Sequence, residues 1–199
     1  MAPRMFLNES FYQRINVVKI ARELLGKGLF TNMEGTITGG MIVETEAYSR
    51  KEKGCHAYKN RMTARNEVMF RNGGLAYVYL CYGIHHLFNV VTNGEGEAEA
   101  VLIRALEPVT GIEKMMMRMK TDQAKRITSG PGKLTKALGI GRRHNGVTLH
   151  SDDLWIADLG KVVKRKEVVA SQRIGIDFAG KDALLPWRFA LLDNPWISK

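Results

Sequence analysis

The chain has 199 residues, 45 % hydrophobic and 25 % charged, an ordinary composition for one globular domain with a substantial core. No apolar run approaches the ~20 residues that cross a bilayer, and residues 1–6 lack the apolar stretch of a secretory signal. We therefore expect one domain over residues 1–199, neither membrane-bound nor secreted. Two cysteines suit a reducing compartment: the cytoplasm or nucleoid of a bacterium, or the nucleus of a eukaryote.

The net charge of +10 is concentrated in one region. Residues 111–166 hold 13 lysines or arginines against 5 acids. A basic region in a chain without membrane segments indicates a polyanionic partner, most often nucleic acid. The alternative is a basic surface with no special partner.

In the first half of the chain, apolar residues at helical spacing predict a helix over residues 10–25, ended by Gly26. A turn at residues 32–35 leads to a strand that ends at Tyr48. Residues 49–62 are polar and predict a loop, and residues 63–70 predict a short capped helix. Aromatic and β-branched residues predict strands over 75–80, 87–92 and 100–106.

In the second half, Thr110 and Glu113 stand at the spacing of a capping box, which predicts a helix over residues 110–119. Its methionines at 115–117 are interpreted as core residues. Another helix opens at Ser129, with Pro131 suited to its first turn. Further strands are predicted at 153–157, 173–178 and 187–192.

The strand that ends at Tyr48 carries two acids. Because side chains alternate along a strand, Glu44, Glu46 and Tyr48 share one face. A carboxylate beside an aromatic ring suits a flat, ring-containing substrate, although the charged edge of a strand can also simply meet solvent. Arg104 is the one charge within the apolar run 100–106, and a buried arginine requires an acidic or anionic partner.

Other motifs allow more than one interpretation. The helix at Ser129 can offer backbone amides and Lys133 to a phosphate, or it is only a capped helix; Leu134 follows Lys133, so it is not a nucleotide-binding P-loop. Tyr77, Tyr79 and Tyr82 can stack on bases, with Tyr82 projecting from a turn, or can be packing residues. The cysteines and histidines fit no common zinc spacing, so we predict no metal site.

The order of these segments resembles that of the alkyladenine (methylpurine) DNA glycosylase family from about residue 10 to residue 196. The segments that carry the resemblance are Val43–Tyr48, His56, Arg65-Asn66, Met69-Phe70, Tyr77–Tyr79, Tyr82-Gly83, Asn89-Val90, Leu102–Pro108, Ser129–Leu134 and Arg173–Gly175. The family implies an α/β fold of the α+β type, a single compact domain around a curved, mainly antiparallel sheet with flanking helices.

The resemblance also implies a role for each site residue. Glu46 matches the general base, and Arg104 and the Ile174 carbonyl match groups that hold the attacking water. The substrate-binding positions are Tyr48 on one face of a flipped base, His56 and Tyr79 on the other, and Asn89, which disfavours the amino group of guanine. The DNA-binding positions are the intercalating Tyr82, together with Lys133 and Arg65.

We therefore expect a monofunctional enzyme without cofactor or metal. It would act as a monomer on double-stranded DNA and hydrolyse the N-glycosidic bond of alkylated or deaminated purines (3-methyladenine, 7-methylguanine, hypoxanthine or ethenoadenine). No lysine stands where an imine nucleophile would, so no strand cleavage is expected. One alternative is a DNA-damage-binding protein of the same fold that has lost catalysis, and another is a small-molecule transferase.

Overall fold

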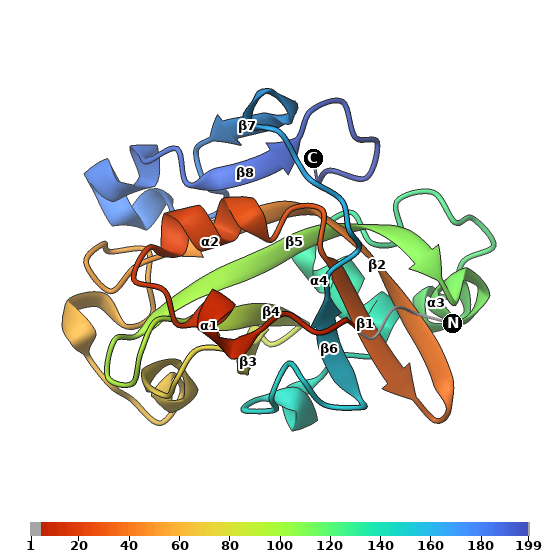
Figure 1. Cartoon of the computed structure of the whole chain (residues 1–199), viewed down its shortest axis with the longest axis horizontal. Helices are drawn as coiled ribbons and strands as arrows, with labels where there is room; N and C mark the ends of the chain where they lie inside the picture. Colours follow the sequence, from red (N-terminus) through yellow and green to blue (C-terminus); the bar gives the residue numbers. More distant parts are fainter. Residues whose placement is uncertain (1–4, 199) are drawn as a thin grey trace.

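The two longest strands, β2 (Thr36–Tyr48) and β5 (Glu99–Thr110), run antiparallel along the middle of one sheet (Figure 1). The computed structural model describes residues 5–198, so both ends of the predicted domain lie outside it. Within this range the sheet has eight strands, in the order β3-β4-β5-β2-β1-β6, with β8 pairing β2 and β7 pairing β8. The other strands are β1 (Gly28–Met33), β3 (Ala76–Cys81), β4 (His85–Thr92), β6 (Leu154–Ala157), β7 (Val168–Ser171) and β8 (Arg188–Leu191).

Helices cover both faces of this sheet. The α-helices are α1 (Glu9–Tyr12), α2 (Val17–Glu23), α3 (Ile112–Met119) and α4 (Pro131–Leu138), and single 3-10 segments span Tyr58–Asn60, Glu67–Phe70, Arg142–His144, Arg165–Glu167 and Asp177–Leu184. Figure 1 shows α2 in front of the sheet and α4 behind it. The Thr45 hydroxyl donates to the Ala21 carbonyl at 2.8 Å, so α2 covers the face of β2 opposite Glu44 and Glu46.

The fold class expected from the resemblance is confirmed: every strand pair is antiparallel, and helices flank one sheet. The predicted strands over 75–80, 87–92, 100–106, 153–157 and 187–192 correspond to β3, β4, β5, β6 and β8. Among residues 5–198, no helix has the length and apolarity that crossing a membrane would require.

Two predicted helices are wrong in their extent. The helix over residues 10–25 is broken into α1 and α2 because Asn16 caps the second helix, accepting from the Lys19 amide at 2.9 Å. The helix over residues 63–70 is reduced to the 3-10 segment Glu67–Phe70. The Asn66 side chain accepts from the Thr63 amide at 2.7 Å and closes a local turn instead.

Three details of the second half also differ. The predicted capping box is absent, because α3 begins after Gly111 in the left-handed region (φ 70°) with no side-chain cap. Of its methionines, Met115 is buried but Met117 is 71 % exposed. Residues 173–178 form a bend that enters a 3-10 segment, not a strand, whereas the short strand β7 was not predicted.

Candidate active site

An irregularity between β2 and β5 brings Arg104 between the two glutamates. The register steps from Glu44 opposite Ala105 to Thr45 opposite Ile103, which leaves Arg104 without a Cα partner. Such bulges re-aim a side chain. Arg104 Nε donates to Glu44 at 2.9 Å, and Arg104 Nη1 lies 3.2 Å from Glu46. The predicted need of Arg104 for an acidic partner is confirmed.

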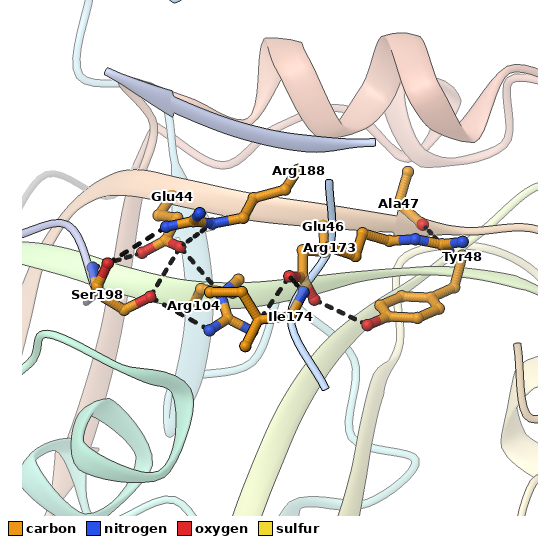
Figure 2. A network of polar contacts seen from close by, with 9 residues as sticks. All are labelled: Glu44, Glu46, Ala47, Tyr48, Arg104, Arg173, Ile174, Arg188 and Ser198. Carbon is orange, nitrogen blue, oxygen red and sulfur yellow. Dashed lines mark hydrogen bonds and ion pairs between the residues drawn. The ribbon is translucent and has the colours of Figure 1, made fainter. Parts of the chain in front are cut away.

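The Glu44 carboxylate is bound by residues from several segments of the fold (Figure 2). Besides Arg104, its carboxylate accepts from Arg188 Nε at 2.6 Å and from the Ser198 amide and hydroxyl at 2.7 and 2.8 Å. Three of the four donors reach Oε1, and the Ser198 amide reaches Oε2, so both oxygens of the carboxylate are held. Glu44 therefore joins β2, β5, β8 and the C-terminal segment.

Glu46 has fewer donors than Glu44. Its Oε1 accepts from the Ile174 amide at 2.8 Å and faces Arg104, and its Oε2 accepts from the Tyr48 hydroxyl at 2.7 Å. These contacts use three of about four acceptor positions, which leaves Oε2 able to accept another proton donor. Neither glutamate is exposed, so the alternative of a charged strand edge in solvent is wrong.

Charge pairing sets the protonation of the groups around Glu46. Burial alone would lower the pKa of Arg104, but Glu46 and Glu44 raise it above its ordinary value, so the guanidinium stays charged. Burial and the neighbouring Glu46 carboxylate raise the pKa of Tyr48 well above its ordinary range. Tyr48 therefore remains a hydroxyl donor toward Glu46.

A cavity of about 870 Å³ opens over this centre. The predicted site residues that line it are Tyr48, His56, Arg65, Tyr79, Tyr82, Asn89, Arg104, Lys133 and Ile174. Glu46 is not among the lining residues, because Tyr48, Arg104 and Ile174 stand between its carboxylate and the cavity. The charged side chains among the described lining residues are all cationic. The structure thus gathers the predicted positions around one cavity, with the carboxylate beneath it.

His56 and Tyr79 form an aromatic wall of the cavity. Their ring centroids lie 4.6 Å apart at an edge-on angle of 66°, and His56 Nδ1 is 2.9 Å from the Tyr77 hydroxyl. Burial, and then the positive charge of Arg65, lower the pKa of His56 to about 4. His56 is also exposed to solvent at the cavity, and the solvent reduces the size of this pKa shift. The imidazole is therefore neutral at pH 7.

Arg65 and Asn89 also contact the tyrosines of β3. The Arg65 guanidinium carbon lies 4.9 Å from the Tyr79 ring centroid, a cation–π distance. The Asn89 amide donates to the Tyr77 carbonyl at 3.1 Å and is held on the cavity lining. Tyr77 and Tyr79 both line the cavity, but Tyr77 is buried at 1 % exposure and packs in the core, whereas Tyr79 is half-buried.

Tyr82 projects from the tip of the β3–β4 hairpin, as predicted. It is 89 % exposed, and both Tyr82 (φ 51°) and Gly83 (φ 72°) are in the left-handed region. A non-glycine residue held there is uncommon and costs roughly 1–3 kcal/mol. The turn holds the Tyr82 ring in solvent.

The N-terminus of α4 closes another side of the cavity. Pro131 occupies its first turn, as predicted, and Gly130 precedes it without a side-chain cap. Lys133 is exposed, while Ser129 is buried with a hydroxyl that has no hydrogen-bond partner among the described residues. Backbone amides, a lysine and a hydroxyl here suit an anionic oxygen.

Several residues of the site escaped the sequence reasoning. Arg188 and Ser198 hold Glu44, and Arg173 with Glu52 forms a buried ion pair at 2.7 Å behind Tyr48. Arg188 stands between apolar residues of its segment, the same signal that pointed to Arg104. Ser198 and Glu52 carried no such signal, because only the fold brings them to the site. Within residues 5–198, no three or more His, Cys, Asp or Glu side chains are grouped to hold a metal ion.

The fold and site define an α+β protein with an aromatic cavity above a buried carboxylate–guanidinium centre. The model of the methylpurine-DNA glycosylase (MPG) family matches residues 10–195, and the chain belongs to that family. Curated relatives named "Putative 3-methyladenine DNA glycosylase" are similar over nearly full length. The protein from Carboxydothermus hydrogenoformans is 45 % identical (98 % of this chain, all of the relative), and that from Alkaliphilus oremlandii is 41 % identical with the same coverage. A Chlamydia pneumoniae relative is 45 % identical over 93 % of this chain and 94 % of its own.

Proposed function

We propose that this protein is a DNA-repair glycosylase that hydrolyses the N-glycosidic bond of damaged purines in duplex DNA. The observation that carries the proposal is the Glu46 carboxylate, held by Arg104 directly beneath an aromatic-lined cavity. The family membership supports the same activity. The substrate class is purines alkylated at N3 or N7, hypoxanthine and ethenoadenine, and the protein acts as a monomer.

The damaged nucleotide enters the cavity by flipping, and the exposed Tyr82 ring fills the gap in the stack. Tyr48 covers one face of the base, and His56 with Tyr79 covers the other. The Asn89 amide stands against the exocyclic amino group that normal guanine carries. Lys133, Arg65 and the basic region 111–166 bind phosphates.

Hydrolysis then proceeds at the deoxyribose C1′ atom. The bond from C1′ to the purine nitrogen breaks, its electron pair leaves with the purine, and positive charge develops on the sugar; a purine alkylated at N3 or N7 is cationic and so leaves as a neutral base. A water oxygen bonds to C1′, and its proton passes to Glu46, most directly to Oε2, which accepts only the Tyr48 hydroxyl in the resting state. The Glu46 carboxylate has no exposed surface, so a covering group must yield to water as the nucleotide enters. Arg104 and the Ile174 carbonyl orient that water.

A base-release assay on duplexes that each carry one lesion tests this function. Release of free purine without strand cleavage until alkali is added supports a monofunctional glycosylase, and a borohydride-trapped protein–DNA adduct contradicts it. Binding of lesion duplex without any release would favour the inactive damage-binding protein. A salt-insensitive protein with no preference for duplex DNA would favour a small-molecule enzyme.

A further inference from the structure

Arg173 is a deeply buried charged group near the cavity that the proposed chemistry does not use. Its side chain has no exposed surface, and it is paired with Glu52 through two hydrogen bonds of 2.7 and 2.9 Å. It also donates to the Ala47 carbonyl at 2.8 Å and to the Asp182 carbonyl at 3.1 Å. One guanidinium therefore joins β2, the loop after it and the 3-10 segment Asp177–Leu184.

The same guanidinium supports the Tyr48 wall from behind. The Arg173 guanidinium carbon lies 4.8 Å from the Tyr48 ring centroid, and Figure 2 shows the two groups next to each other. Tyr48 lines the cavity, whereas Arg173 does not. The arginine therefore occupies the buried side of the ring, leaving the cavity side to a substrate. Through Tyr48 it also fixes the hydroxyl that donates to Glu46 at 2.7 Å.

Arg173 also holds the main chain that covers Glu46. The next residue, Ile174, donates its amide to Glu46 Oε1 at 2.8 Å, yet its side chain is 43 % exposed and so anchors little by packing. Gly175 follows in the left-handed region (φ 77°). Residues 174 and 175 form a bend outside any strand or helix, so the Arg173 contacts before it and the buried Ile176 after it restrain that amide.

Stability alone does not account for this pair. Buried ion pairs often contribute no more than apolar packing of the same volume would, because both charges must be desolvated. The planar guanidinium instead provides several donors in a fixed geometry, which a lysine cannot reproduce. Glu52 extends the arrangement, because it accepts from the amide of Gly54, another lining residue, at 2.6 Å.

We propose that Arg173, anchored by Glu52, is a positioning residue that holds the Tyr48 ring and the Ile174 amide in register with the Glu46 carboxylate. This role rests on the proposed function, since it acts through the general base. It predicts a loss in the chemical step. Lesion binding depends also on Tyr82, the His56–Tyr79 wall and phosphate contacts, so the affinity should fall less than the rate.

The test is the Arg173→Lys variant, with Arg14→Lys as the matched control. Arg14 is a half-buried arginine that is paired with Glu23 at 2.6 Å and lies 4.5 Å from the Phe11 ring centroid, and it does not line the cavity. We expect kcat for base release to fall about 10- to 100-fold in Arg173→Lys, as misplacement of a reacting group by about 1 Å does. KM should change less than about 3-fold, and Arg14→Lys should keep both constants.

Glu52→Gln decides the question if Arg173→Lys does not fold, because it keeps the shape and one acceptor; its kcat should fall about 3- to 10-fold at unchanged KM. The role is overturned if the Arg173 or Glu52 variant loses no more kcat than Arg14→Lys. It is equally overturned if lesion affinity falls in proportion to the rate, since a merely structural residue would do that. An inactive wild type would instead overturn the proposed function itself.

Discussion

Replacing Glu46 by glutamine separates the two glutamates that the sequence places on one face. The glutamine carbonyl can keep the contacts of Oε1 with Ile174 and Arg104, and its amide can face the Tyr48 hydroxyl, which can turn and accept. The hydrogen bonds from Ile174 and Tyr48 become neutral, and the contact with Arg104 loses one of its two charges. At about 1 kcal/mol for each contact, the variant should lose about 3 kcal/mol of unfolding free energy. The fold should survive.

Hydrolysis of the N-glycosidic bond should be lost in Glu46→Gln. A positioned general base contributes about 10²- to 10⁴-fold to the rate, so single-turnover base release from a hypoxanthine duplex should fall at least 100-fold in Glu46→Gln. The affinity for the same duplex, measured by fluorescence anisotropy, should stay within about 3-fold. Together these results would show a loss of hydrolysis without loss of lesion binding.

Glu44→Gln is the matched control, with the opposite expectation. Its new amide must face either the Ser198 amide, which can only donate, or the guanidinium groups. Removing the negative partner of the buried arginines costs roughly 3–5 kcal/mol, so Glu44→Gln should be less stable than Glu46→Gln in thermal melts. If Glu46→Gln kept more than about a tenth of the wild-type rate while a folded Glu44→Gln did not, Glu46 would not be the base.

Three further outcomes follow from the geometry. Tyr82→Ala should change the melting temperature little, because the ring is exposed, but should weaken lesion-duplex binding roughly 5- to 100-fold through lost stacking, as anisotropy will measure. The pKa of His56 falls from 6.5 to about 4 on folding, so the contribution of its neutral form is present above pH 6.5 and is lost as the pH falls from 6.5 to 4. In pH-dependent melts, the wild type should therefore lose more stability over this range than His56→Gln. Lys133→Ala should reduce the slope of log affinity against log salt by about 1.

A specific result would contradict each of these three predictions. Full lesion affinity in Tyr82→Ala would show that the Tyr82 ring does not fill the gap in the base stack. The same pH dependence of stability in wild type and His56→Gln would show that the imidazole is not held neutral. An unchanged salt slope in Lys133→Ala would place that amine away from the phosphates.

The strands were largely predictable from the sequence because their information is local. Alternation placed Glu44, Glu46 and Tyr48 on one face, and the single charge in an apolar run marked Arg104 as paired. The turn at Tyr82 was equally local. Helix boundaries failed where a short polar side chain made its own contact, as Asn16 and Asn66 do.

The sequence by itself determined which residue types meet along each strand, and through its motifs it determined the family. It could not tell Glu44 from Glu46, because alternation treats them alike. Only the tertiary structure separated them: Ser198 and Arg188, more than 140 positions away, supply three of the four donors to Glu44. The groups that hold Glu46 leave it an acceptor position beneath the cavity, because contacts between distant segments are set by packing of the whole sheet and not by local pattern.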